Sequence, residues 1–358
     1  MKNLVLLFGG QSTEHEVSCR SVLTVLRAVN REKYRPILVG ITKTGDWIPV
    51  ENGDKIQDGS WREGKRRAML LPDAGWKSLV YFEEDGSSHC EKVGIVFPVL
   101  HGKGGEDGTV QGLLELAEIP YVGCGVLSSA ISMDKISTKL AVRKTLEGQG
   151  VRQANYISLT RAEWKKEKRR EEIEKEAEEV LHFPLFVKPS NAGSSCGVSK
   201  VEKKEDLCSA VEKALAVDRR VLIEEFIKGR ELECAVFSGT AGEVIASSVG
   251  EIQAAAEFYD YDAKYNNPDS KTELNPVLPA TVEERIQKAA KSIFLAVDGY
   301  SLSRVDFFFT GEEIVFNEIN TMPGFTSISM YPMLFEKVGW NIEELVEKLI
   351  ASAENRPS

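Results

Sequence analysis

The stretch SLSRVDFFFTGEEIVFNEIN, residues 301–320, predicts a tight β-hairpin with polar groups on one side. Side chains alternate between the two faces of a strand, so Arg304 and Asp306 share a face of the first arm. A threonine and a glycine supply the turn. On the return arm, the same alternation predicts one face made of Ile314, Phe316, Glu318 and Asn320. Pairing the arms brings Asp306, Glu318 and Asn320 together beside Arg304.

These oxygen ligands suit magnesium, and a cation beside them suits a polyphosphate. The alternative is a surface hairpin with ordinary solvated charges. Carboxylates inside a strand, flanked by valine and phenylalanine, are poorly explained by solvation alone. We therefore expect a magnesium and polyphosphate site on this hairpin.

The chain has 358 residues, more than one hydrophobic core usually supports, so two or three domains are expected. A net charge of -10 and a pI near 5.2 argue against nucleic acid or an anionic membrane as the main partner. The apolar run at residues 4–8 is too short for a signal peptide or a membrane span, so a cytoplasmic location is expected. Six scattered cysteines without a CxxC pair indicate neither a zinc site nor a disulfide framework.

The chain opens with an α/β pattern. Residues 3–8 predict a buried strand, and Thr13 with Glu16 forms a capping-box pattern that predicts the start of a helix. Further strands are expected at 36–41 and 94–100. A strand, a glycine turn and a helix in this order predict an α/β domain.

Helices and strands also alternate later in the chain. The predicted segments are helices at 126–149 and 205–216 and strands at 185–188 and 221–226. Residues 161–181 carry dense mixed charges at helical spacing, which indicates a solvated helix face. Residues 251–280 show little periodicity and are long for a connection, which is typical of a functional lid or a disordered segment.

Lys188 ends an apolar strand and is followed by PSNAGSSCG, whose small side chains let backbone N–H groups approach an anion. An ordinary glycine and serine surface loop fits this pattern equally well. Neither a GxxxxGK[ST] phosphate loop nor a dinucleotide fingerprint occurs in the sequence. By itself, the segment is only a candidate phosphate site.

Residues 193–197, GSSCG, match the GxSxG pattern of serine hydrolases, with Ser195 as the nucleophile. That fold requires a helix directly after the serine, whereas residues 197–202 alternate like a strand. Its triad also requires a histidine later in the chain, and the last histidine here is His182. The hydrolase is therefore a remote alternative.

Other polar positions are ambiguous from the residues alone. His101, in LHGKGGEDGT, follows a strand where glycines let the chain turn close to a ligand, but a lone histidine is more often structural. Glu14 either favours the dipole of the first helix or holds an ammonium group. Glu224, in VLIEEFI, and Glu231 after it fit a nucleotide pocket, although such strands are common.

Taken in order, these segments resemble the ATP-grasp enzymes, in particular the D-alanine:D-alanine ligases, over nearly the whole chain. The matching segments are GGQSTEHEVS, LHGKGGEDGTVQG, SMDK, VKPSNAGSS, LIEEFI, FYDYDAKY, RVDFFF and NEINTMPGFTS. The resemblance implies a three-domain α/β ATP-grasp fold with an N-terminal Rossmann-like domain. It implies a substrate-binding domain at 1–123, a central domain at 124–222 and a C-terminal domain at 223–358 that carries the lid.

The resemblance also implies roles for individual residues. The ATP-binding positions are Lys135, Lys188, Glu224, Phe226, Ile227, Glu231, Lys264 and Asn317, with the three lysines on the phosphates. Two magnesium ions, for which manganese can substitute, would be held by Asp306, Glu318 and Asn320. The catalytic positions are Glu14, Ser194, Tyr265, Arg304 and Gly324, and the substrate-binding positions are Val17, His101, Ser329 and Met330.

The implied reaction transfers the γ-phosphoryl group of ATP to the carboxylate of a first D-alanine, and the amine of a second D-alanine attacks the acylphosphate. Arg304 and the N–H of Gly324 would stabilise the tetrahedral intermediate. Ser194 would link Glu14 to Tyr265 of the lid, which keeps water from the acylphosphate. The resemblance implies a role in peptidoglycan synthesis and a homodimer.

The second substrate is open to alternatives, namely D-lactate or D-serine in place of D-alanine. In the related ligases that use D-lactate, a histidine stands where this chain has Tyr265, and residues 251–280 contain no histidine. D-Alanine is therefore favoured over D-lactate. An ATP-binding scaffold without turnover is a further alternative, and the filled set of charged positions argues against it.

Overall fold

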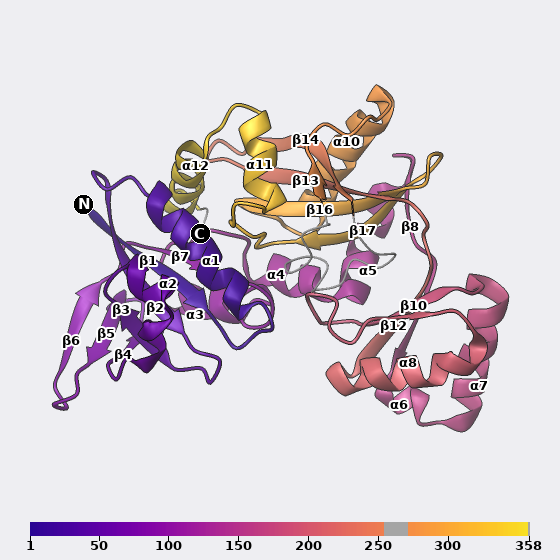
Figure 1. Ribbon diagram of the computed structural model, residues 1–358, viewed down its shortest axis with the longest axis horizontal. Helices are drawn as coiled ribbons and strands as arrows, with labels where there is room; N and C mark the ends of the chain where they lie inside the picture. The colour runs from indigo at the N-terminus through magenta and orange to yellow at the C-terminus, as the bar shows by residue number, and fades with distance from the viewer. Residues whose placement is uncertain (254–270, 357–358) are drawn as a thin grey trace.

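The computed structural model describes residues 1–253 and 271–356 of the chain. Its strands form four sheets, of four, four, six and three strands. In Figure 1 the N-terminal part lies on the left, the middle of the chain at the lower right and the C-terminal part above. Among the helices of the described residues, none combines the length and the apolarity that a membrane span needs. The expected mixed α/β architecture is confirmed.

The N-terminal part is built on a sheet of order β3-β2-β1-β7. Strand β1 pairs in parallel with β2 and β7, and its residues 4–8 are fully buried, as expected of a central parallel strand. The elements of this sheet and its helices are β1 (Lys2–Gly9), α1 (His15–Ala28), β2 (Tyr34–Ile41), β3 (Trp47–Val50), α2 (Gly53–Gln57), η1 (Ser60–Glu63), β7 (Ile95–Val99) and α3 (Thr109–Leu116). A separate antiparallel sheet contains β4 (Arg67–Leu70), β5 (Ser78–Phe82) and β6 (Ser88–Lys92).

The start of α1 differs from the predicted capping box. The N-cap position is Glu14, and no side chain caps the helix. The Glu14 N–H donates to the Ser12 hydroxyl at 3.1 Å, while Glu16 forms an ion pair with Arg62. The predicted pairing of Thr13 with Glu16 is therefore wrong, because the glutamate is held by a cation outside the helix.

The middle of the chain forms an antiparallel sheet of order β11-β10-β12-β9. Its elements are β9 (Tyr156–Thr160), α6 (Arg161–Trp164), α7 (Glu167–Glu176), η2 (Ala177–Leu181), β10 (Leu185–Pro189), β11 (Ser199–Val201), α8 (Lys204–Val217) and β12 (Arg220–Glu225). Helix α7 buries only Ile173, which confirms the solvated helix face predicted for this segment. Lys188 lies on β10 directly before the glycine and serine loop, as predicted.

The C-terminal part is a sheet of order β15-β14-β13-β16-β17-β8. Its elements are β13 (Arg230–Ser238), β14 (Val244–Gln253), β15 (Lys271–Glu273), α10 (Ala280–Ala296), β16 (Leu302–Phe309), β17 (Ile314–Asn320), α11 (Met330–Lys337) and α12 (Ile342–Glu354). Most of the predicted lid, including Lys264 and Tyr265, lies outside the described residues.

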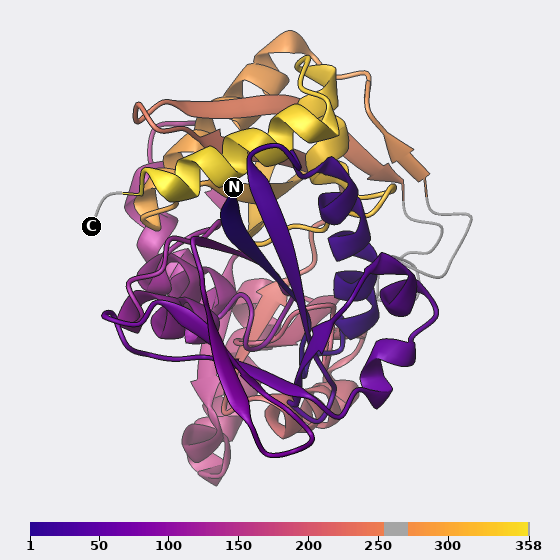
Figure 2. The same ribbon diagram turned by 90° about the vertical axis from the view of Figure 1, so that its left-hand side faces the viewer.

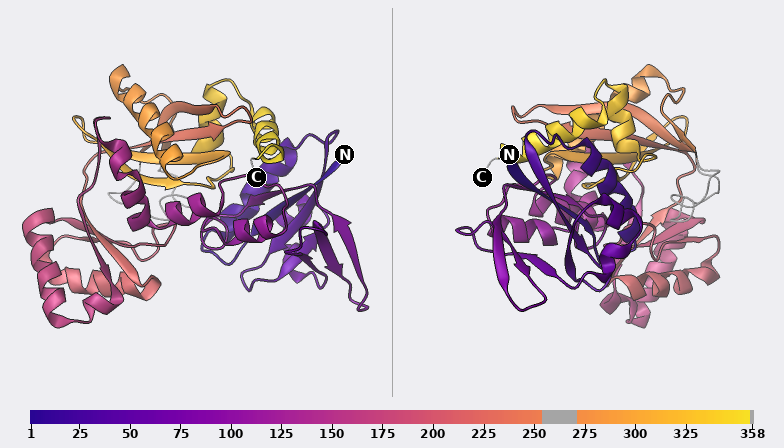
Figure 3. Two further views of the ribbon diagram at one scale, coloured as in Figure 1. Left: turned by 180° about the vertical axis from the view of Figure 1, so that it is seen from behind. Right: turned by 60° about the vertical axis from the view of Figure 1, so that its left-hand side comes forward.

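Residues before 154 contribute to this C-terminal sheet. Strand β8 (Val151–Gln153) pairs in parallel with β17, and α5 (Lys135–Leu146) shares a buried apolar cluster with α10. Helix α4 (Val126–Met133) precedes α5, and the rear view shows both helices on the lower side of the C-terminal sheet (Figure 3). The limits 1–123, 124–222 and 223–358 remain predictions. Strand β8 belongs to the predicted central domain by sequence, but it pairs within the C-terminal sheet.

Strands β16 and β17 form the predicted hairpin, but with a bulge. Asp306 pairs with Glu318, and the next pair is Phe307 with Phe316, so Asn317 is the extra residue. Ile314 and Phe316 therefore share the apolar cluster of Phe307 rather than the face of Glu318. The predicted single face of the return arm is wrong, and the bulge is what turns two carboxylates toward one side.

One apolar core joins the N-terminal sheet to the C-terminal helices. It includes Leu4 and Phe8 of β1 together with Leu345 and Leu349 of α12. In Figure 2, α12 lies beside the start of β1 and α1. The first strand and the last helix of the chain are thus packed together.

Candidate active site

The polar face of the hairpin gathers opposite charges in a buried place. The Arg304 guanidinium donates from Nε and Nη2 to the two carboxylate oxygens of Asp306, at 2.8 and 2.6 Å. Glu233 of β13 lies 3.1 Å from Arg304 Nε. Glu318, opposite Asp306, lies 3.5 Å from the ammonium of Lys135. Asp306 therefore contacts Arg304, and the strand register places Glu318 and Asn320 opposite these two residues, as predicted.

Burial opposes the charge of Arg304, but the carboxylates of Asp306 and Glu233 outweigh it and hold the pKa of Arg304 well above its usual value. The arginine is therefore a permanent cation. Asn320 lies opposite Arg304, and its Oδ1 accepts a hydrogen bond from the Met322 N–H at 2.9 Å. This bond orients the amide oxygen and leaves its second lone pair available to a ligand.

A cleft of about 600 Å³ lies between the central and the C-terminal sheets. Of the residues predicted to bind ATP or metal, those that line it are Lys135, Lys188, Glu224, Phe226, Ile227, Glu231, Asp306, Asn317 and Glu318. Phe226 and Phe186 pack with ring centroids 5.7 Å apart on one wall. An aromatic wall with lysines and carboxylates further along suits a base at one end and phosphates at the other.

Inside the cleft, Glu224 binds two lysines. Its Oε2 lies 2.6 Å from Lys188, and its Oε1 lies 2.6 Å from Lys139 of α5. The sequence analysis missed Lys139. Its signal was available, because Lys139 follows Lys135 by four residues and so shares its helix face.

A smaller cavity of about 60 Å³ adjoins the cleft. The predicted site residues that line it are Glu14, His101, Lys135, Ser194, Arg304, Glu318, Asn320 and Gly324. Lys135, Ser194 and Glu318 line both spaces, so the two are continuous at these side chains. Groups bound in the cleft and in the cavity would meet there.

Glycines let the loops converge on Glu14. A Cβ on Gly102 would lie 2.8 Å from Glu14 Oε2, and one on Gly193 would lie 3.0 Å from the same atom. Ser194 follows with φ +49, and its hydroxyl is buried without a hydrogen-bond partner among the described residues. That hydroxyl is available to accept a hydrogen bond from a ligand or to donate one to it.

His101 connects the N-terminal part to the loop after the hairpin. Its Nδ1 lies 2.9 Å from the Met322 carbonyl oxygen and its Nε2 lies 3.2 Å from the Ser21 hydroxyl. Ser21 in turn accepts from the Phe325 N–H. Burial lowers the pKa of His101, so the ring is held neutral. This histidine therefore both holds two parts of the chain together and faces the cavity.

Glu106 lines the cavity and was missed by the sequence analysis. Its Oε2 accepts from the Gly102 N–H at 2.7 Å, while its Oε1 is buried without a partner among the described residues. Burial and the nearby Glu14 carboxylate raise the pKa of Glu106 well above 4.5. A carboxyl in this setting is neutral where an exposed one would be ionised.

The remaining predicted substrate residues lie around these two spaces rather than in their lining. Val17 is buried on α1, and Met330 is buried at the start of α11. Ser329 holds the loop before α11, since its hydroxyl accepts from the Thr326 N–H at 2.9 Å. It lies next to Gly324 of the cavity wall, where a Cβ would come within 2.6 Å of its Oγ.

Residues 3–124 match the family model described as D-ala D-ala ligase N-terminus, and residues 145–351 match the one described as D-ala D-ala ligase C-terminus. The chain belongs to the D-alanine–D-alanine ligase family. The expected family is therefore confirmed.

Members of this ligase family resemble the chain over nearly its whole length. A D-alanine–D-alanine ligase of Acetivibrio thermocellus is 47% identical over 99% of this chain and 96% of its own. One from Natranaerobius thermophilus is 43% identical over 96% and 93%.

Solved structures of the ligase family agree with the fold. The VanG D-Ala:D-Ser ligase of Enterococcus faecalis superposes with a TM-score of 0.87 at 39% identity, covering 98% of this chain and 99% of its own. The D-alanine–D-alanine ligase of Coxiella burnetii gives 0.82 at 31% identity, covering 99% and 96%. These similarities confirm the ATP-grasp fold class.

The hydrolase alternative fails on local structure. Ser195 lies in a loop with φ +55, and the next element is the strand β11 rather than a helix. The chain has no histidine after His182, so a Ser, Asp, His order cannot form. Ser194 and Ser195 instead line the cleft between the central and the C-terminal sheets.

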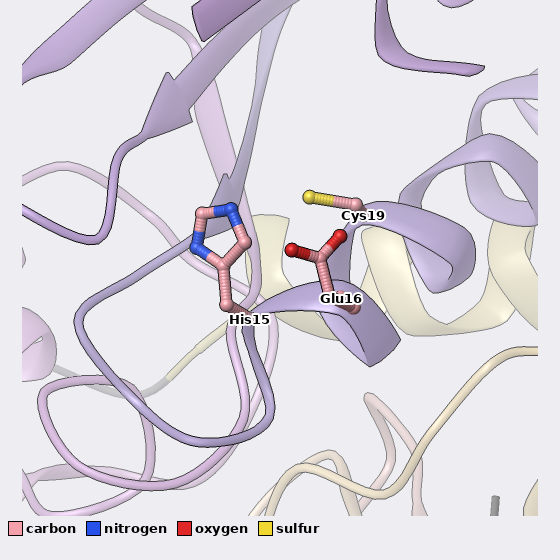
Figure 4. A group of neighbouring side chains, drawn as sticks. All are labelled: His15, Glu16 and Cys19. Atoms are coloured by element: carbon pink, nitrogen blue, oxygen red, sulfur yellow. The ribbon is translucent and has the colours of Figure 1, made fainter. Parts of the chain in front are cut away.

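His15, Glu16 and Cys19 form a second polar group at the start of α1 (Figure 4). Glu16 is paired with Lys43 at 3.0 Å and Arg62 at 2.9 Å, and burial raises the pKa of the Cys19 thiol to about 12. The carboxylate is thus engaged by cations and the thiol keeps its proton. We assign this group no ligase function and no metal.

Proposed function

We propose that the chain joins two D-alanines, at the expense of ATP, to form D-alanyl-D-alanine for peptidoglycan synthesis. The observation that carries the proposal is the meeting of the cleft with the small cavity at Lys135, Ser194 and Glu318. A nucleotide in the cleft would end where an amino acid in the cavity begins. That juxtaposition suits phosphoryl transfer from ATP to a carboxylate, for which positioning and charge are the main needs.

The nucleotide would bind along the cleft. Glu224, Phe226, Ile227, Glu231 and Asn317 would surround the base and ribose, and Lys135, Lys188 and Lys264 would hold the phosphates. The donor set of Asp306, Glu318 and Asn320 fits magnesium, because all three offer hard oxygen atoms and two are carboxylates. Two magnesium ions, or manganese in their place, would offset the charge of the phosphates there.

The first D-alanine would bind in the cavity, with its ammonium group on Glu14 near His101. Its carboxylate would then lie toward Arg304 and the N–H of Gly324, which would stabilise the oxyanion of the tetrahedral intermediate. The second D-alanine would enter beside Ser329 and Met330, with Val17 behind the pocket. Ser194 would connect Glu14 to Tyr265, and closure over the site would exclude water from the D-alanyl phosphate.

D-Serine is the second candidate for the amine that attacks. The similarity to the VanG D-Ala:D-Ser ligase favours it, whereas the relatives named D-alanine–D-alanine ligase favour D-alanine. D-Lactate has less support, since residues 251–280 contain no histidine. ADP release should rise with D-alanine and not with L-alanine, and D-alanine alone should suffice. Turnover that required added D-serine would instead support the second candidate.

The family likeness also supports a homodimer in the cytoplasm that works on small molecules, without nucleic acid or membrane. The net charge of -10 agrees with the absence of an anionic partner. Light scattering behind size-exclusion chromatography would measure the mass in solution. A mass equal to one chain would contradict the homodimer.

A further inference from the structure

The buried Glu224 lies in the sheet between two lysines that come from different elements. Lys188 reaches it from the neighbouring strand β10, and Lys139 reaches it from helix α5, each at 2.6 Å. The side chain of Lys139 is 3% exposed, and that of Lys188 is 15% exposed. The two lysines are therefore not equivalent: Lys188 lines the cleft, whereas Lys139 lies at the edge of a separate hollow, of about 1150 Å³, on the other side.

The lining of the cleft also separates Lys188 from Lys139. Lys188 and Glu224 line the cleft of about 600 Å³, whereas Lys139 does not. Behind the carboxylate, the Lys139 ammonium lies 5.3 Å from the centroid of the Tyr156 ring, which adds a cation–π contact. Lys139 is fixed in the protein, while Lys188 faces the space where the phosphates are expected.

The charges of Lys139, Lys188 and Glu224 sum to one positive charge. Of the two lysines, Lys188 presents its ammonium group to the cleft. When a polyphosphate draws on Lys188, the buried Glu224 carboxylate still needs a counter-ion, because an unpaired buried charge is strongly destabilising. Lys139 supplies it without leaving its place. We infer that Lys139 is a positioning residue for nucleotide binding, which keeps Glu224 ionised and in place so that Lys188 can serve the phosphates.

The surroundings of Glu224 support this division of roles. The charged and titratable groups that face it or its partner Lys188 are Lys139 from α5, Lys188 from β10, Tyr156 from β9, Glu231 from β13 and Glu318 from β17. Burial would raise the pKa of Glu224, but the two ammonium groups outweigh it and lower that pKa to about 2. With Lys139 gone, burial would be opposed by Lys188 alone, and Lys188 would be held more tightly to Glu224.

This inference rests on the proposed ATP-dependent function, so its test measures nucleotide binding without D-alanine. Calorimetry of the full chain with Mg·ADP should give a Kd at least about tenfold higher for Lys139→Met than for wild type. Removing one partner of a buried ion pair costs more free energy than a tenfold change in Kd corresponds to. Lys139→Arg should restore most of the affinity. Lys144→Met is the matched control, an exposed lysine on the same helix, and should bind like wild type.

Steady-state kinetics separate positioning from a merely structural role. Lys139→Met should raise the KM for ATP while kcat at saturating ATP stays within about twofold. The binding interaction that is lost is made equally in the ground state and in the transition state. The acidic limb of its kcat/KM for ATP should also move to higher pH, because the pKa of Glu224 rises. An unchanged Kd and an unchanged KM for ATP in folded Lys139→Met would overturn the inference.

A double variant keeps the test decisive if Lys139→Met is poorly stable. In a Glu224→Gln background there is no buried carboxylate to hold, so Lys139→Met should change the Kd for Mg·ADP by less than about twofold. A loss of affinity as large as in the wild-type background would contradict the inference. Binding of Mg·ADP by a wild-type chain that makes no dipeptide would refute the proposed reaction alone, and the comparison of variants would still decide the role of Lys139.

Discussion

Arg304 and Asp306, two residues apart on β16, are joined by paired hydrogen bonds of 2.8 and 2.6 Å between guanidinium and carboxylate. Both side chains are buried. Removal of either charge would leave the other under-compensated, which costs far more than losing a surface ion pair. In the proposed mechanism this one pair supplies both the donor to the oxyanion and a magnesium ligand.

Asp306→Asn should lower turnover by about 10³-fold, because the site loses a magnesium ligand and the charge opposite Arg304. ADP release at saturating ATP and D-alanine measures the loss. Asp298→Asn serves as the control, since Asp298 is exposed and lies outside the lining of the cleft and cavity. Asp306→Asn activity within a few-fold of wild type would refute the metal assignment.

Gly324→Ala should impair the reaction through crowding. The new Cβ would lie 2.6 Å from Ser329 Oγ, so Ser329 must give up its bond with the Thr326 N–H. We expect kcat/KM for D-alanine to fall about tenfold, a loss of about 1.4 kcal/mol in transition-state binding. Gly112→Ala is the control, because nothing lies within 4 Å of its Cβ. Equal rates in the two variants would contradict the role of Gly324.

Glu106→Gln should change the pH dependence of stability. The folded-state pKa of Glu106 is raised above the ordinary 4.5, so the folded protein keeps a proton that the unfolded chain releases. This contribution to the free energy of unfolding is full below pH 4.5 and is lost as pH rises through the folded-state pKa. Relative to wild type, the Tm of Glu106→Gln should therefore increase with pH. A constant difference in Tm would show that Glu106 is ionised in the folded state.

Ser194→Ala and Ser195→Ala should differ. Ser194 lines both the cleft and the cavity, and Ser195 lines only the cleft. Loss of the Ser194 hydroxyl should lower kcat/KM for D-alanine ten- to hundredfold, about the value of a hydrogen bond to a charged group. Ser195→Ala should stay within about threefold of wild type. The reverse order, or an esterase activity that disappears with Ser195, would favour the hydrolase.

The sequence predicted several elements of the N-terminal and central parts, and the hairpin that carries the candidate magnesium ligands, because these depend on local patterns. Alternation placed Asp306 and Arg304 on one face of a strand, and the structure confirms that they meet. It could not reveal the bulge at Asn317, because bulges depend on how two strands pair rather than on the composition of either. For the same reason β8 could not be assigned to the C-terminal sheet from its three residues.

Two site residues escaped prediction because their importance is electrostatic. The spacing of four residues from Lys135 was the one sequence signal for Lys139, and its pairing with Glu224 is visible only in the fold. Glu106 lies in a glycine-rich loop whose burial no periodicity shows. The capping box predicted at Thr13 is absent, because Glu16 pairs with Arg62, which is distant in sequence. Contacts between distant residues decide all three.

The mass of the product formed from Mg·ATP and D-alanine tests the central claim most directly, with D-serine and D-lactate offered in parallel mixtures. We predict the D-alanyl-D-alanine mass from D-alanine alone, with one ADP released per dipeptide and no product from L-alanine. ADP release without any dipeptide, or a product that forms only when D-serine or D-lactate is present, would contradict the claim.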